Sequence, residues 1–159
     1  MKKKLYVPNK HPKNTAKIFK DLEDDANVAR SQYQFFMDVW EFLNKRQSSV
    51  YTFLAFRRIT DGKWIERSIE IKDGAFSHNV FDLLTEFNRW DFDQYFCPNP
   101  FSKPRRQRQF ALPTRFGWCD IDESDPNAYD PWPSIVWQTS PDRYQALWSW
   151  DKYHEPDEA

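Results

Sequence analysis

Residues 116–122 spell Phe-Gly-Trp-Cys-Asp-Ile-Asp, the pattern of a short buried strand that ends in two acids. Successive side chains on a strand point to opposite faces, so residues i and i+2 share a face. Asp120 and Asp122 are therefore expected to project together, and like charges this close repel one another. A hard cation, Mg²⁺ or Mn²⁺, would relieve this repulsion, because carboxylate oxygens suit these ions. The alternative is that both acids merely belong to a turn or cap a helix.

The composition is typical of a globular chain with a charged surface. Its 159 residues suffice for a domain with a hydrophobic core. The formal net charge is -1, so any nucleic-acid contact must come from local basic patches. No apolar run approaches the roughly 18 residues of a membrane span, and no signal-peptide segment follows the basic N-terminus. Cys97 and Cys119 lack the partners of a zinc site, so we expect reduced thiols, a cytoplasmic location and no membrane partner.

Hydrophobic periodicity predicts an α+β fold with a mixed or antiparallel sheet. Ser31 and Gln34 form a capping-box pattern at the start of the first expected helix. Asp61-Gly62 is a hairpin signal between the first two strands. We expect helices over residues 31–45 and 77–89, and strands over residues 50–59, 64–71, 94–97, 115–121, 134–138 and 143–150.

The two chain ends are expected to contribute little to the core. Residues 1–30 carry seven lysines and then a cluster of acids, which predicts a loose arm. Those lysines could contact nucleic-acid phosphates, or the arm could simply be solvated. Residues 151–159 are polar and acidic, and we expect them to fray. The remaining chain, residues 31–159, is expected to form a single domain.

A stiff basic loop precedes the acid-bearing strand. Pro98, Pro100 and Pro104 restrict its backbone. Its position just before the acids favours binding of phosphates, although a solvated surface loop is the alternative. The cations of this loop are Lys103, Arg105, Arg106 and Arg108.

A second polar segment follows the acids by about twenty residues. It is a turn that leads into a strand whose first residues on one face are Arg143 and Gln145. If this strand pairs with residues 115–121, the carboxylates face a patch of hydrogen-bond donors. Metal-holding carboxylates opposite triphosphate-binding donors form the layout that nucleotidyl transfer needs.

These two segments resemble the archaeo-eukaryotic primase superfamily, in particular the primase-polymerases and plasmid RepB-type primases of phages and mobile elements. Their first motif is Asp-hydrophobic-Asp on a strand, and Asp120-Ile121-Asp122 matches it. Their second motif, in the RepB-like branch, is Thr-Ser-Pro-Gly-x-x-Gln, and residues 139–145 read Thr-Ser-Pro-Asp-Arg-Tyr-Gln. The resemblance covers about residues 94–150.

The resemblance implies an RRM-like primase-polymerase core with an N-terminal αβ lobe. It implies that Asp120 and Asp122 are catalytic and bind Mg²⁺ or Mn²⁺, and that Ser140, Arg143 and Gln145 contact the nucleotide. The implied partners are nucleoside triphosphates, a single-stranded DNA template, and a helicase, either as a downstream domain or as a separate protein.

Three departures from the family pattern keep other functions open. Gln145 stands where many members have His, and Asp142 stands where Gly is expected. The third acidic motif, on a later strand, has no convincing match, because Asp151 follows the second motif too closely and Asp157 lies in the tail. If the resemblance holds, we expect the chain to be either a fragment of a longer protein or a truncated relative with an incomplete metal site. Three functions stay open. The chain is a primase-polymerase module, or a remnant of that fold that binds nucleotide or DNA in replication without catalysis, or an unrelated aromatic-rich interaction domain.

Overall fold

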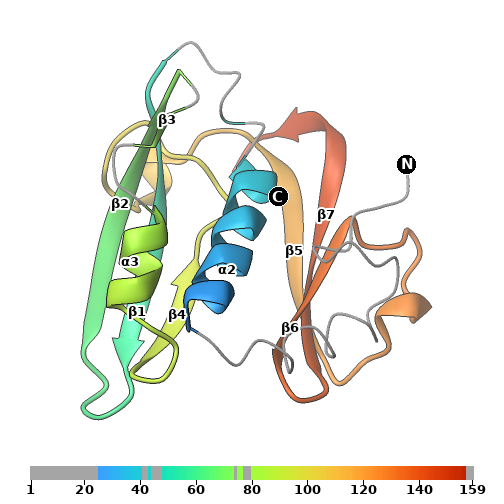
Figure 1. Ribbon diagram of the computed structural model, residues 1–159. Coiled ribbons are helices and arrows are strands. Elements are labelled where there is room, and N and C mark those ends of the chain that lie inside the picture. Colours follow the sequence, from blue (N-terminus) through green and yellow to red (C-terminus); the bar gives the residue numbers. More distant parts are fainter. Residues whose placement is uncertain (1–24, 41–42, 44–47, 74, 77–79, 157–159) are drawn as a thin grey trace. The chain divides into compact units, whose positions relative to one another are not determined.

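The computed structural model describes residues 25–40, 43, 48–73, 75–76 and 80–156 (Figure 1). These residues divide into two compact units. The four-stranded unit comprises described residues up to 114, and the three-stranded unit comprises residues 115–156. Most of the predicted N-terminal arm, the end of the first expected helix and Asp157 lie outside the described residues.

The four-stranded unit is an antiparallel sheet with two helices among its described residues. Its strand order is β3-β2-β1-β4, so β1 is central, which suits the apolar residues on both of its faces. Its elements in chain order are α2 (Asp25–Trp40), β1 (Val50–Arg58), β2 (Trp64–Lys72), β3 (Ala75–Phe76), α3 (Val80–Glu86), β4 (Phe92–Phe96) and a short 3-10 turn, η2 (Arg108–Phe110).

Both helices pack on the same face of this sheet (Figure 1). Phe35 of α2 meets Phe96 of β4 with ring centroids 5.1 Å apart. Phe87, directly after α3, stacks on Phe56 of β1 at 4.5 Å, and Phe56 is fully buried. Large aromatic side chains in edge-to-face and offset contacts therefore form the core of this unit.

The first helix begins earlier than its capping signal predicts. Helix α2 starts at Asp25, six residues before Ser31, so the predicted capping box at Ser31 is wrong. Val28 and Ala29 are buried, and burial of this additional apolar turn extends the helix past a local cap pattern. Residues 25–30, predicted as part of the arm, therefore belong to α2.

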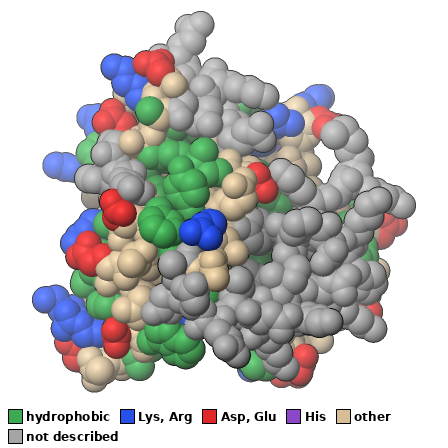
Figure 2. Space-filling model, in the orientation of Figure 1, with side chains coloured by type: hydrophobic (Ala, Val, Ile, Leu, Met, Phe, Trp, Pro, Cys, Tyr) green, Lys and Arg blue, Asp and Glu red, His purple; other side chains and the backbone are tan. Residues whose placement is uncertain are grey.

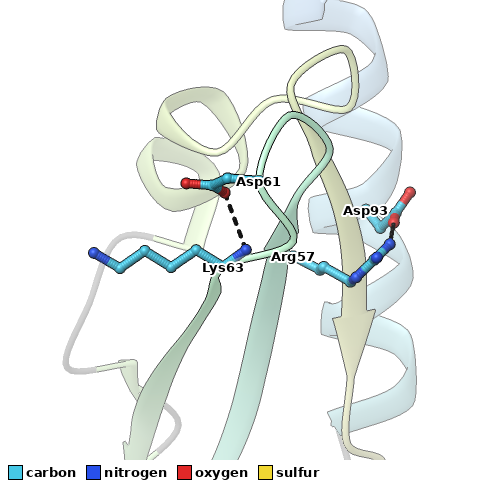
Figure 3. Close-up of polar contacts among 4 residues, drawn as sticks. All are labelled: Arg57, Asp61, Lys63 and Asp93. Carbon is cyan, nitrogen blue, oxygen red and sulfur yellow. Dashed lines mark hydrogen bonds and ion pairs between the residues drawn. The ribbon is translucent and has the colours of Figure 1, made fainter.

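The predicted hairpin between β1 and β2 is confirmed (Figure 3). Gly62 has a φ of 70°, which favours glycine. The Asp61 carboxylate accepts a hydrogen bond of 3.0 Å from the Lys63 backbone N–H, and Arg58 also pairs with it at 3.0 Å. The bond from the Lys63 backbone, with help from Arg58, lowers the pKa of Asp61 below its usual value.

The three-stranded unit is built from β5 (Thr114–Asp122), β6 (Ile135–Ser140) and β7 (Arg143–His154), in the order β5-β7-β6. A 3-10 turn, η3 (Pro126–Ala128), lies between β5 and β6. The expected frayed tail is wrong up to His154, because β7 continues four residues beyond Trp150. The ring of Trp150 packs on His154 at 4.5 Å, which supports this extension.

On the face that Figure 2 shows, the described acidic and basic side chains are interspersed, with hydrophobic side chains among them. Among the described helices, none has the length and apolar character that crossing a membrane requires.

Candidate functional site

The two faces of the three-stranded sheet differ in character. One face carries a hydrophobic cluster of Ile121, Val136 and Ala146, with Tyr144 and Trp148 packed against it. Ile121, between the two acids, is buried. Because side chains alternate along a strand, Asp120 and Asp122 lie on the other face, which we call the site face, and both are exposed.

An ion pair joins the two predicted motifs on the site face. Arg143 Nη1 lies 3.7 Å from Asp122 Oδ1. The contact brings the end of β5 to the start of β7, and Ser140 is the cross-strand partner of Arg143 on β6. Asp122, Ser140 and Arg143 are therefore neighbours, as the sequence predicted for paired strands.

The remaining two predicted site residues share this face. Gln145 follows Arg143 by two residues on β7 and lies opposite Trp137 of β6. Asp120 precedes Asp122 by two residues on β5. Alternate residues of a strand share a face. The Asp120 carboxylate and the Gln145 amide therefore lie on the same face as the Asp122–Arg143 ion pair and extend its polar surface.

Two acids next to the site have left-handed backbone conformations. Asp122 has a φ of 44° and Asp142 a φ of 59°. Residues other than glycine adopt this region rarely, although aspartate and asparagine do so more often than most. Such conformations gather at turns and at functional sites. Both occur where β5 and β6 end, beside the predicted nucleotide site.

Two other polar groups near the site have structural roles. The Asp125 carboxylate caps η3 by accepting a hydrogen bond of 2.9 Å from the Asn127 backbone N–H. Tyr144 packs against the hydrophobic cluster, and burial, followed by the charges of Asp142 and Asp125, raises the pKa of its hydroxyl. We therefore assign neither Asp125 nor Tyr144 a role in binding a ligand.

The donor set suits a weakly held, hydrated divalent cation. Within the described ranges, no group of three or more His, Cys, Asp or Glu side chains could hold a metal ion. Asp151 is eight residues from Arg143 along β7, roughly 26 Å at 3.3 Å per residue, so it does not complete the site. Mg²⁺ keeps several waters and commonly binds through one or two carboxylates and the substrate's phosphates. Asp120 and Asp122 fit that mode.

The basic loop belongs to the four-stranded unit, whereas the acid pair belongs to the three-stranded unit. Arg106 Nε pairs with Glu66 Oε2 at 2.8 Å, and Lys103 lies over the Phe110 ring at 5.0 Å. These contacts anchor the loop to its own unit. It stays a prediction that the cations of this loop hold phosphates beside the acid pair. These cations are Lys103, Arg105, Arg106 and Arg108.

No functional role was predicted from the sequence for three aromatic residues that are exposed in the structure. Trp118 precedes Asp120 by two residues on the site face and is 59% exposed. Trp64 and Tyr95 are exposed in the four-stranded unit. Strand alternation alone could have placed Trp118 beside the acids, but aromatic residues in a strand are more often part of a core.

Comparison with known proteins adds no relative. No protein-family model, no curated protein and no solved structure matches the chain. The function of the chain must therefore be inferred from the site itself.

Proposed function

We propose that the chain is a metal-dependent nucleotidyltransferase module, a DNA primase or polymerase that acts in the replication of a phage, a plasmid or another mobile element. The ion pair between Asp122 and Arg143 carries this proposal. It joins the Asp-x-Asp segment to the Thr-Ser-Pro-Asp-Arg-Tyr-Gln segment, the two motifs that resemble the primase superfamily. A template strand and a helicase would be its partners.

The turn at Asp142 also supports the proposal. The RepB-like motif has glycine at this position, and Asp142 has a φ of 59°, a conformation that glycine adopts at little cost. The turn therefore has the shape that the motif's glycine would allow, although the residue is different. The carboxylate adds a negative charge where a triphosphate would bind.

The residues of the site have distinct roles in this proposal. Asp120 and Asp122 would hold Mg²⁺ or Mn²⁺, which when bound neutralises phosphate charge and activates the attacking hydroxyl. Arg143 and Gln145 would donate hydrogen bonds to the nucleotide, and the Ser140 hydroxyl would donate from the turn. The long, exposed Arg143–Asp122 pair contributes little stability, so Arg143 can exchange the carboxylate for a phosphate at small cost.

Nucleotide affinity should depend on Arg143. Arg143→Ala removes a charge-assisted hydrogen bond to phosphate, so we expect binding of a nucleoside triphosphate to weaken by about 1.5–3 kcal/mol. Titration calorimetry measures the change. Lys152→Ala removes an exposed cation from the same strand and is the matched control, which should bind as wild type. Equal affinity in the Arg143 variant and this control would remove Arg143 from the site.

Nucleotide affinity should increase when Asp142 is replaced. Asp142→Gly relieves the left-handed backbone, by roughly 1 kcal/mol, and removes a charge that repels phosphate. Asp142→Asn removes only the charge and tolerates the same φ. We expect both variants to bind nucleotide more tightly, and only the glycine variant to gain stability from the relieved backbone. Weaker binding by both variants would mean that the Asp142 carboxylate assists the ligand instead.

A second candidate function is binding without catalysis. It is favoured because no group of three or more His, Cys, Asp or Glu side chains among the described residues could hold a metal ion. In that case the chain would bind nucleotide or DNA as a replication accessory protein, and the predicted effects at Arg143 and Asp142 would be unchanged. Only a turnover assay separates the two functions.

A further inference from the structure

One face of the four-stranded sheet is turned away from the two helices. Cross-strand partners share a face, and Ala55 is the partner of Glu66 on β2 and of Tyr95 on β4. Arg57 is likewise the partner of Trp64 and Asp93. The contacts of α2 and α3 use the alternate residues, such as Phe56 and Phe96. We call the face that carries Ala55 and Arg57 the open face.

Two large aromatic side chains stand on this open face without being buried. Trp64 is 57% exposed and Tyr95 is 46% exposed. Their rings contact each other, with centroids 5.0 Å apart and planes inclined at 40°. They come from strands on either side of β1, so their contact crosses the open face over that strand. The pair presents aromatic surface to solvent and adds little to the core.

Two arginines pair with carboxylates of the open face. Arg57 lies on the same face and pairs with Asp93 at 3.2 Å (Figure 3). Arg106 of the basic loop pairs at 2.8 Å with Glu66, which lies directly across from Ala55. Two carboxylates of the open face are therefore already neutralised by arginines.

The basic loop is fixed to the open face at its start as well. Phe101 exchanges backbone hydrogen bonds of 2.7 and 2.8 Å with Tyr51 of β1, and its ring packs on Phe53 at 5.2 Å. Lys103 and Arg105, which follow, form no ion pair with any residue in the described part of the chain. The loop that Arg106 ties to Glu66 of the open face therefore also carries two cations, Lys103 and Arg105, that have no ion-pair partner in the described part of the chain.

We propose that the open face binds single-stranded nucleic acid, with unpaired bases stacked on Trp64 and Tyr95 and phosphates bound by Lys103 and Arg105. Aromatic rings beside a cationic groove are the arrangement that binds single strands without sequence preference, because every base has a stacking face. A duplex hides those faces. The inference extends the proposed function by giving its template strand a surface, yet binding here does not require the acid pair.

The test is binding of a fluorescently labelled oligothymidine by anisotropy, with the full chain. Trp64→Leu and Tyr95→Leu should each weaken binding by at least about fivefold, and the double variant should weaken it further. Trp90→Leu is the matched control, because Trp90 is 61% exposed in the same unit, and it should bind as wild type. Trp64→Phe and Tyr95→Phe keep a ring and should retain most of the affinity, which excludes misfolding as the cause of the loss.

Salt dependence separates stacking from charge. Arg105→Ala should flatten the slope of log affinity against log salt by about 0.7, the contribution of one phosphate contact on a single strand. The leucine variants should weaken binding without changing that slope. Asp120→Asn/Asp122→Asn should bind the oligonucleotide as wild type does. Absence of binding by wild type at low salt, or equal affinity in the Trp64, Tyr95 and Trp90 variants, would overturn the inference without affecting the nucleotide site at Arg143.

Discussion

Replacing Asp120 and Asp122 together by asparagine is expected to abolish binding of Mn²⁺ while the fold stays intact. Both side chains are exposed, so their charge is not needed for packing. Asparagine also tolerates the φ of 44° at position 122. The loss of both anionic ligands leaves only neutral amide oxygens for the cation, so titration calorimetry or paramagnetic relaxation should detect no site.

Replacing Arg143 should affect Mn²⁺ binding in the opposite direction from replacing the two acids. Its guanidinium lies 3.7 Å from Asp122 and competes with a cation for that carboxylate. Arg143→Ala should therefore bind Mn²⁺ as well as wild type or up to about fivefold more tightly, the range of an exposed ion pair, while it binds nucleotide more weakly. Asp151→Asn, which removes an exposed carboxylate farther along β7, is the control. Unchanged Mn²⁺ binding after loss of both acids would exclude the proposed metal site.

Gly117→Ala is expected to destabilise the three-stranded unit by about 1–3 kcal/mol, the usual cost of overpacking. A Cβ atom at position 117 would lie 2.6 Å from Trp150 Cζ2 and 3.0 Å from its Cη2. The Trp150 ring also contacts His154, so it cannot move freely. Strands β5 and β7 therefore pack as they do because residue 117 has no side chain. Urea denaturation measures the loss.

A double-mutant cycle isolates this contact. Trp150→Leu replaces the ring by a smaller group, so Gly117→Ala should cost much less in that background than in wild type. If the cost is the same in both backgrounds, the effect of alanine lies in the backbone and the contact with Trp150 is not its cause.

Much of the fold could be predicted because its signals are local. The Asp61-Gly62 turn follows from backbone chemistry at two positions. The exposure of Asp120 and Asp122 follows from strand alternation around Ile121. The neighbourhood of Asp122 and Arg143 follows once two strands are assumed to pair. Each of these three features is specified by a few consecutive residues or by the pairing of two strands.

The remaining features depend on residues that are distant in sequence. Helix α2 begins at Asp25 because burial of Val28 and Ala29 outweighs the local cap signal at Ser31. Arg106 and Glu66, which form an ion pair, are forty residues apart in the sequence. The contact of Trp64 with Tyr95 can be predicted only if both strands that flank β1 are known. No local pattern specifies such contacts, so the basic loop's anchoring and the open face became evident only from the structure.

The most direct test of the nucleotidyltransferase proposal is incorporation of a labelled nucleoside triphosphate on a single-stranded DNA template, with Mn²⁺ or Mg²⁺ present. Wild type and Lys152→Ala should form labelled product, and Asp120→Asn/Asp122→Asn should form none while unfolding at the same denaturant concentration. A wild-type protein that binds nucleotide and Mn²⁺ but incorporates no label, or a double variant as active as wild type, would contradict catalysis at the acid pair.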